Sequence, residues 1–408
     1  MSALPFVHKQ RGGAGSAADD PRLDDIRNEL DTLAQADLRR VVRVTEARGA
    51  RTLGRDGRPL VDLASNDYLG LARDPRLADA AAEAARVEGS GAGAARLVTG
   101  TRPGHAALEA ELVASFGGAA ALVTASGFAA NLAVLGALLG PDDLVASDIR
   151  NHASLIDGLR LAGATRRLVD ARDPAQVQKA LADRHRFRRA AIVVEGLHGL
   201  DGDLLPLAPL REIAETAQAF LVVDEAHAFG VVGPDGGGAC RAAGLSPTDP
   251  ALVRTGTLGK ALGAQGAFVL GAQEVVDLVT QRGRAFVFST ALAPTAVGAA
   301  RAGLRVAGAE PWRRLRCLDL AARLAEGVPA RPPTATRPAG GILSVELGAP
   351  RAALAAAERL AAEHGVLAIA LRPPTVPAGS SRLRLTVGSD LSDDGLDASV
   401  RALREVLG

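Results

Sequence analysis

The sequence predicts an α/β protein, with a large domain built on a mostly parallel sheet and a smaller C-terminal α+β domain. Two observations lead to this prediction. From Ala119 onward, short apolar runs alternate with helical patterns, which is typical of a parallel sheet covered on both faces. After the Pro-rich stretch Val328–Pro338 the alternation ends, and strands and helices follow in a mixed order, which indicates a second, two-layer unit.

A length of 408 residues suits about two domains. We expect an N-terminal tail and arm over 1–60, the large domain over 61–300 and the small domain over 301–408. Within the arm, Asp24–Val44 is predicted to be a helix that runs into a crossing segment. The first twenty residues lack the apolar core of a targeting signal and resemble a loose tail, whose role stays open.

Seven strands are predicted in the large domain. They are Ala120–Thr124, Leu144–Ser147, Arg167–Val169, Ala190–Glu195, Phe220–Asp224, Val253–Thr257 and Ala267–Leu270. Helical stretches at Ala129–Leu139, Pro174–Arg184 and Leu207–Gln218 separate most of them, and Ala291–Val306 is expected to be a helix that connects the domains. The small domain is predicted to contain strand Ile342–Leu347, helix Arg351–His364, strands Val366–Leu371 and Arg382–Val387, and helix Asp393–Leu407.

Composition narrows the classes of function. A formal net charge of +1 gives no reason to expect nucleic acid or an anionic membrane surface as a partner. The two cysteines, Cys240 and Cys317, form neither a disulfide framework nor a zinc pattern, and they suit the reducing cytoplasm. The uncharged run Ser115–Gly140 is long enough to cross a membrane, but Gly residues and Asn131 interrupt it, so we expect a strand, a turn and a buried helix.

A lysine in a glycine-rich stretch is the first candidate for chemistry. Among 47 basic residues only Lys9, Lys179 and Lys260 are lysines. A lysine amine can form a Schiff base, whereas a guanidinium group cannot. Lys260 stands in Thr255–Gly263 among small residues, where a ligand can approach the backbone closely. A solvated loop lysine fits the same stretch.

An aspartate upstream makes a cofactor site the better interpretation. The apolar run before Asp224-Glu225-Ala226-His227 predicts a buried strand that ends in an acid. Asp224 followed by Lys260 fits pyridoxal phosphate, because Lys binds the aldehyde and Asp keeps the pyridine nitrogen protonated. The acidic motif also occurs in helicases, which need a G-x-x-x-x-G-K-[ST] loop. Arg254 and Ala261 occupy required positions of that loop, so the helicase interpretation is excluded.

Two further stretches suggest anion binding. Ser126-Gly127-Phe128 falls between a predicted strand and a predicted helix, where free N–H groups and the helix dipole can hold a phosphate. Arg382 and Arg384 share one face of a predicted strand after the rigid loop Arg372–Gly379, and Arg suits a carboxylate. Ordinary surface arginines fit as well. The turn Ser65–Leu71, which holds the only Tyr, is consistent with a simple tight turn.

Taken together, these motifs resemble the α-oxoamine synthases, which are fold-type I pyridoxal-phosphate-dependent enzymes. The resemblance runs from about Leu38 to the C-terminus. The matching pieces are Ser65–Leu71, Ser126–Phe128, Asn151–Ser154, Asp224–His227, Thr257-x-x-Lys260, Ser289-Thr290 and Arg372–Gly379. Members of this family condense an amino acid with an acyl thioester and release carbon dioxide. The resemblance therefore implies a transferase that binds pyridoxal 5'-phosphate.

The resemblance also implies roles for single residues. Lys260 would bind the cofactor's aldehyde and act as the base, Asp224 would pair with the ring nitrogen, and His227 would bond the phenolic oxygen. His152 would stack on the ring. The phosphate would be held by Ser126, Gly127, Phe128 and Thr257. Ser289 and Thr290 would reach the phosphate of the other subunit, which implies a homodimer with shared sites. The substrates would contact Arg39, Asn66, Thr375 and Arg384, with the amino-acid carboxylate on Arg384.

The loop Arg372–Gly379 is most similar to the branch of the family that joins L-alanine to a pimeloyl thioester in biotin biosynthesis. Relatives that use glycine usually differ in this loop, and a glycine acyltransferase is the first alternative. Whether coenzyme A or a carrier protein delivers the acyl group stays open, as does the acyl length.

One position departs from the family pattern. Gly199 stands where the family usually has a Ser that contacts the cofactor, so His227 would be left as the main partner of the ring oxygen, with water or His198 as a possible substitute. Phe288 stands where several relatives have Tyr. Two other classes are weighed: a catalytically impaired binding protein, suggested only by Gly199, and a nucleotide-binding oxidoreductase. The second lacks support, because Ala94 replaces the third glycine of G-x-G-x-x-G.

Overall fold

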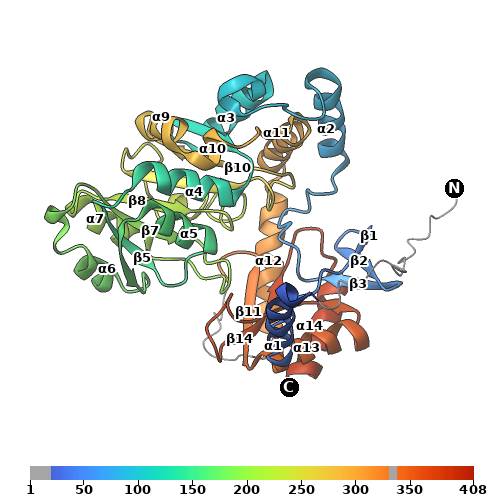
Figure 1. The fold of residues 1–408 in the computed structure, drawn as a ribbon. Coiled ribbons are helices and arrows are strands. Elements are labelled where there is room, and N and C mark those ends of the chain that lie inside the picture. Colours follow the sequence, from blue (N-terminus) through green and yellow to red (C-terminus); the bar gives the residue numbers. More distant parts are fainter. Residues whose placement is uncertain (1–19, 330–337) are drawn as a thin grey trace.

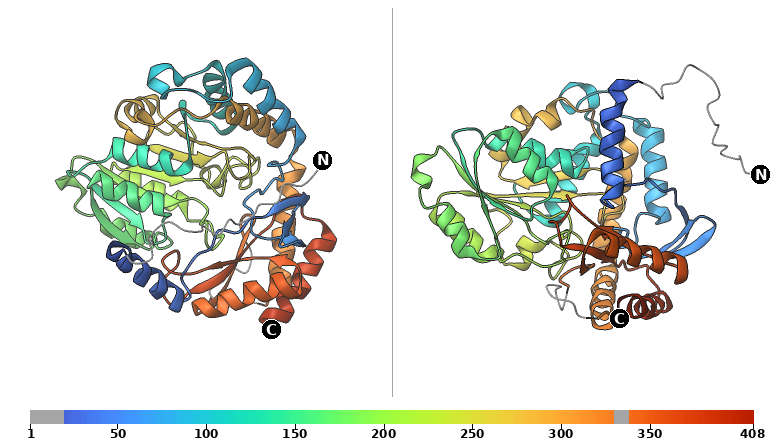
Figure 2. Two further views of the ribbon diagram at one scale, coloured as in Figure 1. Left: turned by 45° about the vertical axis from the view of Figure 1, so that its right-hand side comes forward. Right: turned by 60° about the horizontal axis from the view of Figure 1, so that its bottom comes forward.

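The computed structural model describes residues 20–329 and 338–408, so the predicted tail and most of the Pro-rich stretch lie outside it. Figure 1 shows a larger body, in which helices cover a central sheet, above a smaller body formed by the C-terminal strands and helices. Helix α12 (Trp312–Gly327) runs from the larger body into the smaller one. The further views in Figure 2 show the same division into two bodies.

The larger body is built on a seven-stranded sheet in the order β4-β10-β9-β8-β7-β5-β6. Its strands are β4 (Ala120–Thr124), β5 (Leu144–Asp148), β6 (Thr165–Val169), β7 (Ala190–Glu195), β8 (Phe220–Asp224), β9 (Leu252–Thr257) and β10 (Ala267–Gly271). Neighbours among β5 to β9 pair in parallel, whereas β10 lies antiparallel to β4 and β9. All seven predicted strands are confirmed, and so is the mostly parallel sheet.

Helices cover both faces of this sheet, because each strand turns alternate apolar side chains to opposite sides. In β8, Val222 packs into one hydrophobic cluster, while Leu221 and Val223 pack into another. The first cluster includes α4 (Gly127–Leu138), α5 (Ala153–Ala162), α9 (Gln273–Arg282) and α10 (Arg284–Val287). The second includes α6 (Pro174–Ala180), α7 (Leu207–Thr216) and α8 (Ala239–Ala242). The strand, turn and buried helix expected in Ser115–Gly140 are therefore β4 and α4.

A third layer of helices packs at one edge of the sheet. It consists of α2 (Pro75–Glu88), the short π-helical turn η3 (Arg96–Gly100), α3 (Pro103–Phe116) and α11 (Pro294–Ala309). The predicted connecting helix is confirmed as α11, but α12 was not predicted as a separate helix. Gly298 lets α11 approach α2 closely, since a Cβ there would lie 2.6 Å from the carbonyl oxygen of Ala80. Among the described helices, none has both the length and the apolarity that crossing a bilayer requires.

Two helices end earlier than predicted. Helix α1 (Asp24–Gln35), which follows the 3-10 turn η2 (Pro21–Leu23), ends well before Val44, because Asp37 adopts a left-handed φ of 57°. Helix α6 ends at Ala180, and η4 (Arg184–Arg186) is a separate 3-10 turn. Local periodicity predicted each helix, while the backbone turn after it decided its length.

The smaller body contains a three-stranded antiparallel sheet in the order β11-β14-β13. Its strands are β11 (Ile342–Gly348), β13 (Ile369–Leu371) and β14 (Ser381–Thr386), and the helices are α13 (Pro350–Glu363) and α14 (Asp393–Leu407). The single predicted strand Val366–Leu371 is wrong, because the chain changes sheets within it. Its first part, β12 (Val366–Leu367), pairs in parallel with β3 (Arg58–Asp62), and only β13 pairs with β14.

The N-terminal strands form a third sheet with β12, in the order β1-β2-β3-β12. Its strands β1 (Glu46–Gly49) and β2 (Thr52–Arg55) were not predicted. Through β3 and β12 the N-terminal arm is joined to the C-terminal body, with the Val61 N–H donating to the Gly365 carbonyl at 2.8 Å. The predicted domain boundaries stay predictions.

Candidate active site

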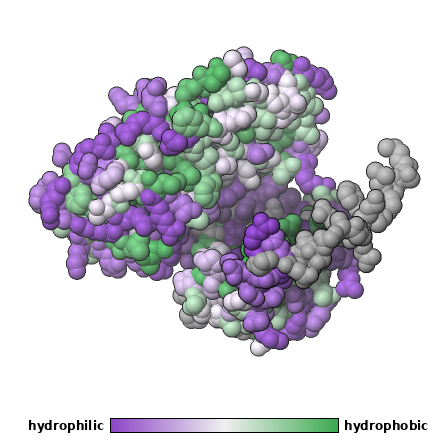
Figure 3. All heavy atoms as spheres, viewed as in Figure 1, coloured by the Kyte–Doolittle hydropathy of each residue, from purple (hydrophilic) through white to green (hydrophobic). Residues whose placement is uncertain are grey.

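The candidate site lies at the carboxyl edge of the large sheet. Asp224 ends β8 and lies in register between Glu195, at the end of β7, and Thr255 in β9. All three side chains are buried. Open α/β sheets place ligand-binding groups at this edge. Figure 3 shows a recess between the two bodies, with largely hydrophilic residues on its visible walls.

The carboxylate of Asp224 is held in one orientation by two donors. Its Oδ2 accepts a hydrogen bond from Nδ2 of Asn131 at 2.7 Å, and its Oδ1 accepts one from the backbone N–H of Ala226 at 2.9 Å. The amide of Asn131 is fixed in turn, because its Oδ1 accepts from the hydroxyl of Thr255 at 2.7 Å. Strands β8 and β9 and helix α4 therefore position one anion together.

The same amide reaches His152. The Nδ2 of Asn131 also donates to Oγ of Ser154 at 2.9 Å, and this hydroxyl lies 2.7 Å from Nδ1 of His152. Because the hydroxyl has a single proton and accepts from Asn131, it donates to Nδ1, which also accepts the backbone N–H of Ser154 at 3.2 Å. A neutral His152 thus carries its proton on Nε2, and Asn131 links the two predicted residues His152 and Asp224.

Lys260 and His227 meet although they follow different strands. Nζ of Lys260 lies 2.8 Å from Nε2 of His227. Burial lowers the pKa of Lys260 to about 8, while the carboxylates of Asp224 and Glu195 act in the opposite direction. The pKa of His227 lies well below its usual value, first because of burial and then because of the charge on Lys260. Near neutral pH, His227 is therefore neutral, and part of Lys260 is the free amine that can attack an aldehyde.

Gly199 occupies a position that has no room for a side chain. Its N–H donates to Oε2 of Glu195 at 3.1 Å, and its carbonyl accepts from Nε of Arg384 at 2.7 Å. A Cβ at this position would lie 2.5 Å from Nε2 of His227, far inside contact distance. Gly199 is not among the positive-φ residues, so the close imidazole, and not the backbone conformation, requires a glycine. Burial raises the pKa of Glu195.

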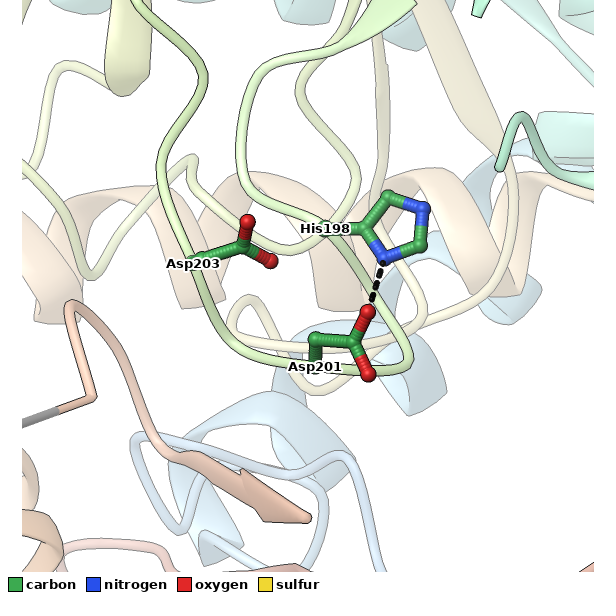
Figure 4. Close-up of side chains that lie close together, drawn as sticks. All are labelled: His198, Asp201 and Asp203. Atoms are coloured by element: carbon green, nitrogen blue, oxygen red, sulfur yellow. Dashed lines mark ion pairs between the residues drawn. The ribbon is translucent and has the colours of Figure 1, made fainter. Parts of the chain in front are cut away.

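The ring of His198 contacts Arg150 and Asp201. Its Nε2 lies 2.7 Å from the backbone oxygen of Arg150, and its Nδ1 lies 3.4 Å from Oδ2 of Asp201. The dashed line in Figure 4 marks this ion pair with Asp201. Burial acts to lower the pKa of His198, but the carboxylates of Asp201 and Glu195 raise it above its ordinary value. Among the described residues no hydrogen bond joins His198 to His227 or Lys260, and its substitution for the missing hydroxyl stays a prediction.

His198, Asp201 and Asp203 lie close enough together to resemble metal ligands (Figure 4). However, Arg150 donates to Asp201 at 3.3 Å and to Asp203 at 3.1 Å, and Arg382 pairs with Asp201. Two guanidinium groups thus neutralise the carboxylates, and the cluster connects β14 to the loop after β7 as an ion-pair network.

The turn after β3 contributes to the site. Oδ1 of Asn66 accepts from Nη2 of Arg384 at 3.1 Å and from the hydroxyl of Tyr68 at 3.2 Å. The same hydroxyl lies 2.7 Å from Nδ1 of His227. Burial raises the pKa of Tyr68 to about 12. The interpretation of this stretch as a simple tight turn is incomplete, because Asn66 and Tyr68 join Arg384 to His227.

Arg51 holds this turn from the hairpin. Its guanidinium group is buried and donates to four backbone carbonyls at 2.8–3.1 Å. The acceptors belong to Asp62, Ser65, Asp67 and Thr386. The N-terminal arm therefore fixes the backbone that carries Asn66 and Tyr68.

The predicted phosphate residues gather at the N-terminus of α4. The hydroxyl of Ser126 caps this helix by accepting from the Ala129 N–H at 3.2 Å. In the first turn of a helix, the N–H groups of Gly127 and Phe128 have no acceptor within the helix. Thr257 lies beside them, since a Cβ on Gly127 would lie 3.9 Å from its Cβ. These N–H groups and the helix dipole together form an anion-binding arrangement.

Four predicted residues make no hydrogen bond to the groups around Lys260: Ser289, Thr290, Arg39 and Thr375. Ser289 and Thr290 follow α10 at the surface. Arg39 is exposed, and its side chain forms no hydrogen bond with the described residues. Its neighbour Arg40 contacts the hydroxyl of Thr375 at 3.4 Å instead.

Sequence reasoning missed three residues that organise the site, namely Tyr68, Asn131 and Arg51. Asn131 could have been found, because an amide in an otherwise apolar, buried helix requires partners. Tyr68 carried a signal as the only tyrosine of the chain. Arg51 gave no signal, since nothing local distinguishes it from the many other arginines.

Comparison with known proteins assigns the chain to a class and then to a family. The profile of the family described as aminotransferase class I and II matches residues 58–403. The 8-amino-7-oxononanoate synthase of Anaeromyxobacter dehalogenans is 46% identical over 94% of this chain and 96% of its own. The enzyme of the same name from Mycobacterium sp. (strain JLS) is 44% identical over the same shares. The chain therefore belongs to the 8-amino-7-oxononanoate synthase family within the aminotransferase class I and II proteins.

Solved structures agree with this assignment. A serine palmitoyltransferase from S. paucimobilis, with bound PLP–myriocin aldimine, superposes with a TM-score of 0.86 at 25% identity, covering 94% of this chain and 97% of its own. The 8-amino-7-oxononanoate synthase from Francisella tularensis gives a TM-score of 0.73 at 25% identity, over 85% of this chain and 98% of its own. The fold-type I prediction is confirmed, and the oxidoreductase alternative is excluded.

Proposed function

We propose that this chain condenses L-alanine with a pimeloyl thioester to give 8-amino-7-oxononanoate, carbon dioxide and free thiol, as a pyridoxal-phosphate-dependent step of biotin biosynthesis. One observation carries the proposal. Lys260, whose pKa is lowered to about 8, lies 2.8 Å from His227 and near enough to the strand-end carboxylate of Asp224 and to Arg384 for their charges to act on its pKa. The names of the curated relatives support the same reaction.

The side chains fit the groups of pyridoxal phosphate. Lys260 offers an amine to the aldehyde, Asp224 offers an oriented carboxylate to the ring nitrogen, and His227 offers a ring nitrogen to the phenolic oxygen. The N-terminus of α4, with Gly127 and Phe128, suits the phosphate. When bound, this cofactor supplies an aldehyde that bonds to amines and a ring that withdraws electrons from the amino acid's α-carbon.

Lys260 is the proposed general base for the α-proton of alanine. A base acts best when its pKa lies near the working pH, and a pKa of about 8 satisfies this condition. Asn131 and Ala226 hold Asp224 so that its negative charge stays at the end of β8. His152, fixed through Ser154, presents its ring at the start of α5.

Arg384 is the proposed receptor for the carboxylate of alanine. Its Nε and Nη2 are held by the Gly199 carbonyl and by Asn66, while Nη1 makes no hydrogen bond with the described residues. The guanidinium group is thereby oriented before any substrate arrives, which lowers the entropic cost of binding. Such a group can bind a carboxylate by donating charge-assisted hydrogen bonds to it.

The test supplies the purified protein with pimeloyl coenzyme A and either alanine or glycine, and measures thiol release and the mass of the product. We expect alanine to be favoured by roughly tenfold or more in kcat/KM, since one methyl group in a fitted pocket is worth about 1–3 kcal/mol. A preference for glycine would contradict the proposed substrate and support the glycine acyltransferase alternative. A protein without a cofactor absorption band in the visible range would contradict catalysis itself.

The acyl donor is tested separately by comparing pimeloyl coenzyme A with a pimeloyl carrier protein. Arg39 and Thr375 are proposed to lie along the acyl path, and Arg40 already contacts the loop that carries Thr375. Arg39→Ala and Thr375→Ala should raise KM for the acyl donor and leave KM for alanine unchanged. An effect on alanine alone would contradict this placement.

A homodimer with shared sites is proposed from the surface around Ser289 and Thr290. Thr290 bridges to Ala95, and exposed apolar side chains nearby in sequence include Leu97, Val98 and Phe288. The test mixes a Lys260→Ala protein with a Ser289→Ala/Thr290→Ala protein after partial denaturation. Activity that rises above that of both parents supports shared sites, whereas a monomeric mass in light scattering contradicts them.

The cytoplasm is the proposed compartment. Both cysteines, Cys240 and Cys317, are buried free thiols, which a reducing environment maintains. Localisation of a tagged full-length chain by fractionation tests this proposal.

A further inference from the structure

Four side chains form one hydrogen-bonded row across the site. Nζ of Lys260 lies 2.8 Å from Nε2 of His227, and Nδ1 of His227 lies 2.7 Å from the hydroxyl of Tyr68. This hydroxyl lies 3.2 Å from Oδ1 of Asn66. The row joins the amine proposed as the base to the residue beside the proposed carboxylate receptor, Arg384.

Asn66 can only accept in this row. Nη2 of Arg384 is a donor, so the oxygen of the Asn66 amide must face it, and this same oxygen faces Tyr68. Tyr68 has one proton and two acceptors within reach, Asn66 Oδ1 and His227 Nδ1. Where its proton points therefore decides which nitrogen of His227 carries hydrogen.

Two arrangements satisfy the row. With Lys260 as an ammonium group, Nζ donates to Nε2 of His227, the proton of His227 is on Nδ1 and donates to Tyr68, and Tyr68 donates to Asn66. With Lys260 as a free amine, Nζ gains a lone pair that can accept, so Nε2 can carry the proton and donate to Nζ while Tyr68 turns its own proton to Nδ1. The neutral His227, whose pKa lies well below its usual value, permits both arrangements.

We propose that Tyr68 is a positioning residue that couples the tautomer of His227 to the protonation state of Lys260 by turning its single proton between Asn66 and His227. The inference extends the proposed function, because only the arrangement with hydrogen on Nε2 presents a donor to a cofactor's ring oxygen. The inference rests on the proposed function, because the ring oxygen belongs to the proposed cofactor. The proton positions that it describes, however, are those of this chain's own side chains.

The first arrangement contains one hydrogen bond more than the second, because Tyr68 and Asn66 are then bonded. Because only the free amine of Lys260 can accept in the second arrangement, Tyr68 favours the ammonium form over that arrangement. A single neutral hydrogen bond changes an equilibrium by about two- to tenfold. Other charges act on the same pair and stay in place when Tyr68 is changed: Asp224, Glu195, Arg384, His152 and His198.

The chain is well suited to the test. Lys260 is one of three lysines, so an amine-reactive reagent followed by peptide mass spectrometry reports its free-amine fraction, with Lys179 as internal reference. Tyr68 is the only tyrosine, so its ionisation is visible in the absorbance of the full-length protein. Selective 15N labelling of the seven histidines reports the tautomer of His227, and a His227→Gln protein assigns its signals.

In the full-length protein freed of cofactor, we expect the proton of His227 to move from Nδ1 to Nε2 with the same pH midpoint as the labelling of Lys260. One unchanged tautomer across that midpoint would overturn the proposal without any variant. In Tyr68→Phe, Lys260 should bind its proton about two- to tenfold more weakly, so that it labels faster near neutral pH. An unchanged midpoint in a folded Tyr68→Phe protein would also overturn it.

Ser344→Ala is the matched control. Ser344 lies opposite Arg384 in the sheet, and its buried hydroxyl has no hydrogen-bond partner among the described residues. Its removal should leave both midpoints unchanged, and a change equal to that of Tyr68→Phe would overturn the assignment to the tyrosine hydroxyl. No substrate is involved, so a failure of the proposed reaction and a failure of this inference give different results.

Discussion

The site has two walls that are built in different ways. The wall with Asp224, His152 and Lys260 comes from the ends of neighbouring strands in one sheet and the loops that follow them. The opposite wall, with Tyr68 and Arg384, comes from an N-terminal turn and a C-terminal strand. The first wall needs only the order of strands to bring its residues together, whereas the second needs the N-terminal hairpin, the turn and the small body to assemble together.

The walls also differ in how their polar groups are fixed. On the sheet wall, Asn131 donates both to Asp224 and to Ser154, which in turn contacts His152. On the other wall, backbone carbonyls supply much of the order, since the Gly199 carbonyl holds Arg384 and four carbonyls accept from Arg51. Changes on the sheet wall should therefore alter chemistry, and changes on the other wall should alter substrate binding and stability.

The largest expected effect is that of Lys260→Ala. This change removes the amine proposed both as the cofactor's anchor and as the base, so turnover should fall by about three orders of magnitude or more. Loss of the visible absorption band and of a borohydride-reducible bond checks the anchor. The control is Lys179→Ala on α6, which should keep full activity, and a reducible bond that persists in Lys260→Ala would place the anchor elsewhere.

Asp224→Asn should give the next largest effect. A neutral amide cannot hold a protonated ring nitrogen, and it would place a second amide against Nδ2 of Asn131. Most exchange of the α-proton of alanine into deuterated water, followed by NMR, should be lost. Near-wild-type exchange would mean that Asp224 is only structural.

Asn131→Leu is the matched change at the residue that donates a hydrogen bond to Asp224. Loss of a hydrogen bond to a charged group costs about 1.5–3 kcal/mol, so the exchange rate should fall by roughly ten- to hundredfold.

Arg51→Met tests the other wall. Removing the buried guanidinium group leaves four carbonyls without their donor, so the free energy of unfolding should fall by about 3 kcal/mol or more. Denaturant unfolding measures this effect, and KM for alanine should rise because Asn66 and Tyr68 lose their support. Arg48→Met, an exposed change in β1, is the control and should be nearly neutral. Equal stability of both variants would contradict the role of Arg51.

Gly199→Ser should have the smallest of these effects. It tests a residue that contacts both walls, since Gly199 bonds to Glu195 and to Arg384. The added Cβ would lie 2.5 Å from His227, so the imidazole must move, at a cost of about 1–3 kcal/mol. Cofactor affinity in a reconstitution titration should fall by roughly five- to hundredfold.

Gly199→Ala separates the Cβ from the hydroxyl. If crowding decides the result, Ala and Ser should weaken binding equally. Tighter binding by Gly199→Ser would show that the hydroxyl contact outweighs the crowding.

Much of the sheet wall could be predicted before the structure was known. An apolar run that ends in Asp224, a scarce lysine among small residues and a glycine between strand and helix are local patterns, and parallel strands bring their carboxyl ends to one edge. The same patterns predicted all seven strands of the large sheet. The split of Val366–Leu371 between two sheets escaped prediction, because pairing partners far away in the sequence decided it.

By itself, the sequence determined the α/β class, the strand ends that carry Asp224 and Lys260, and the family to which these motifs belong. Only the tertiary structure decided that Tyr68 meets His227, that Arg51 supports their turn, and that Gly199 leaves room for an imidazole. The physical reason is the range of the interactions. The spacing of apolar residues along a strand or helix depends on neighbours in the sequence, so it can be seen in the sequence. The hydrogen bonds and close contacts of Tyr68, Arg51 and Gly199 join segments that are far apart in the sequence, so only the folded structure shows them.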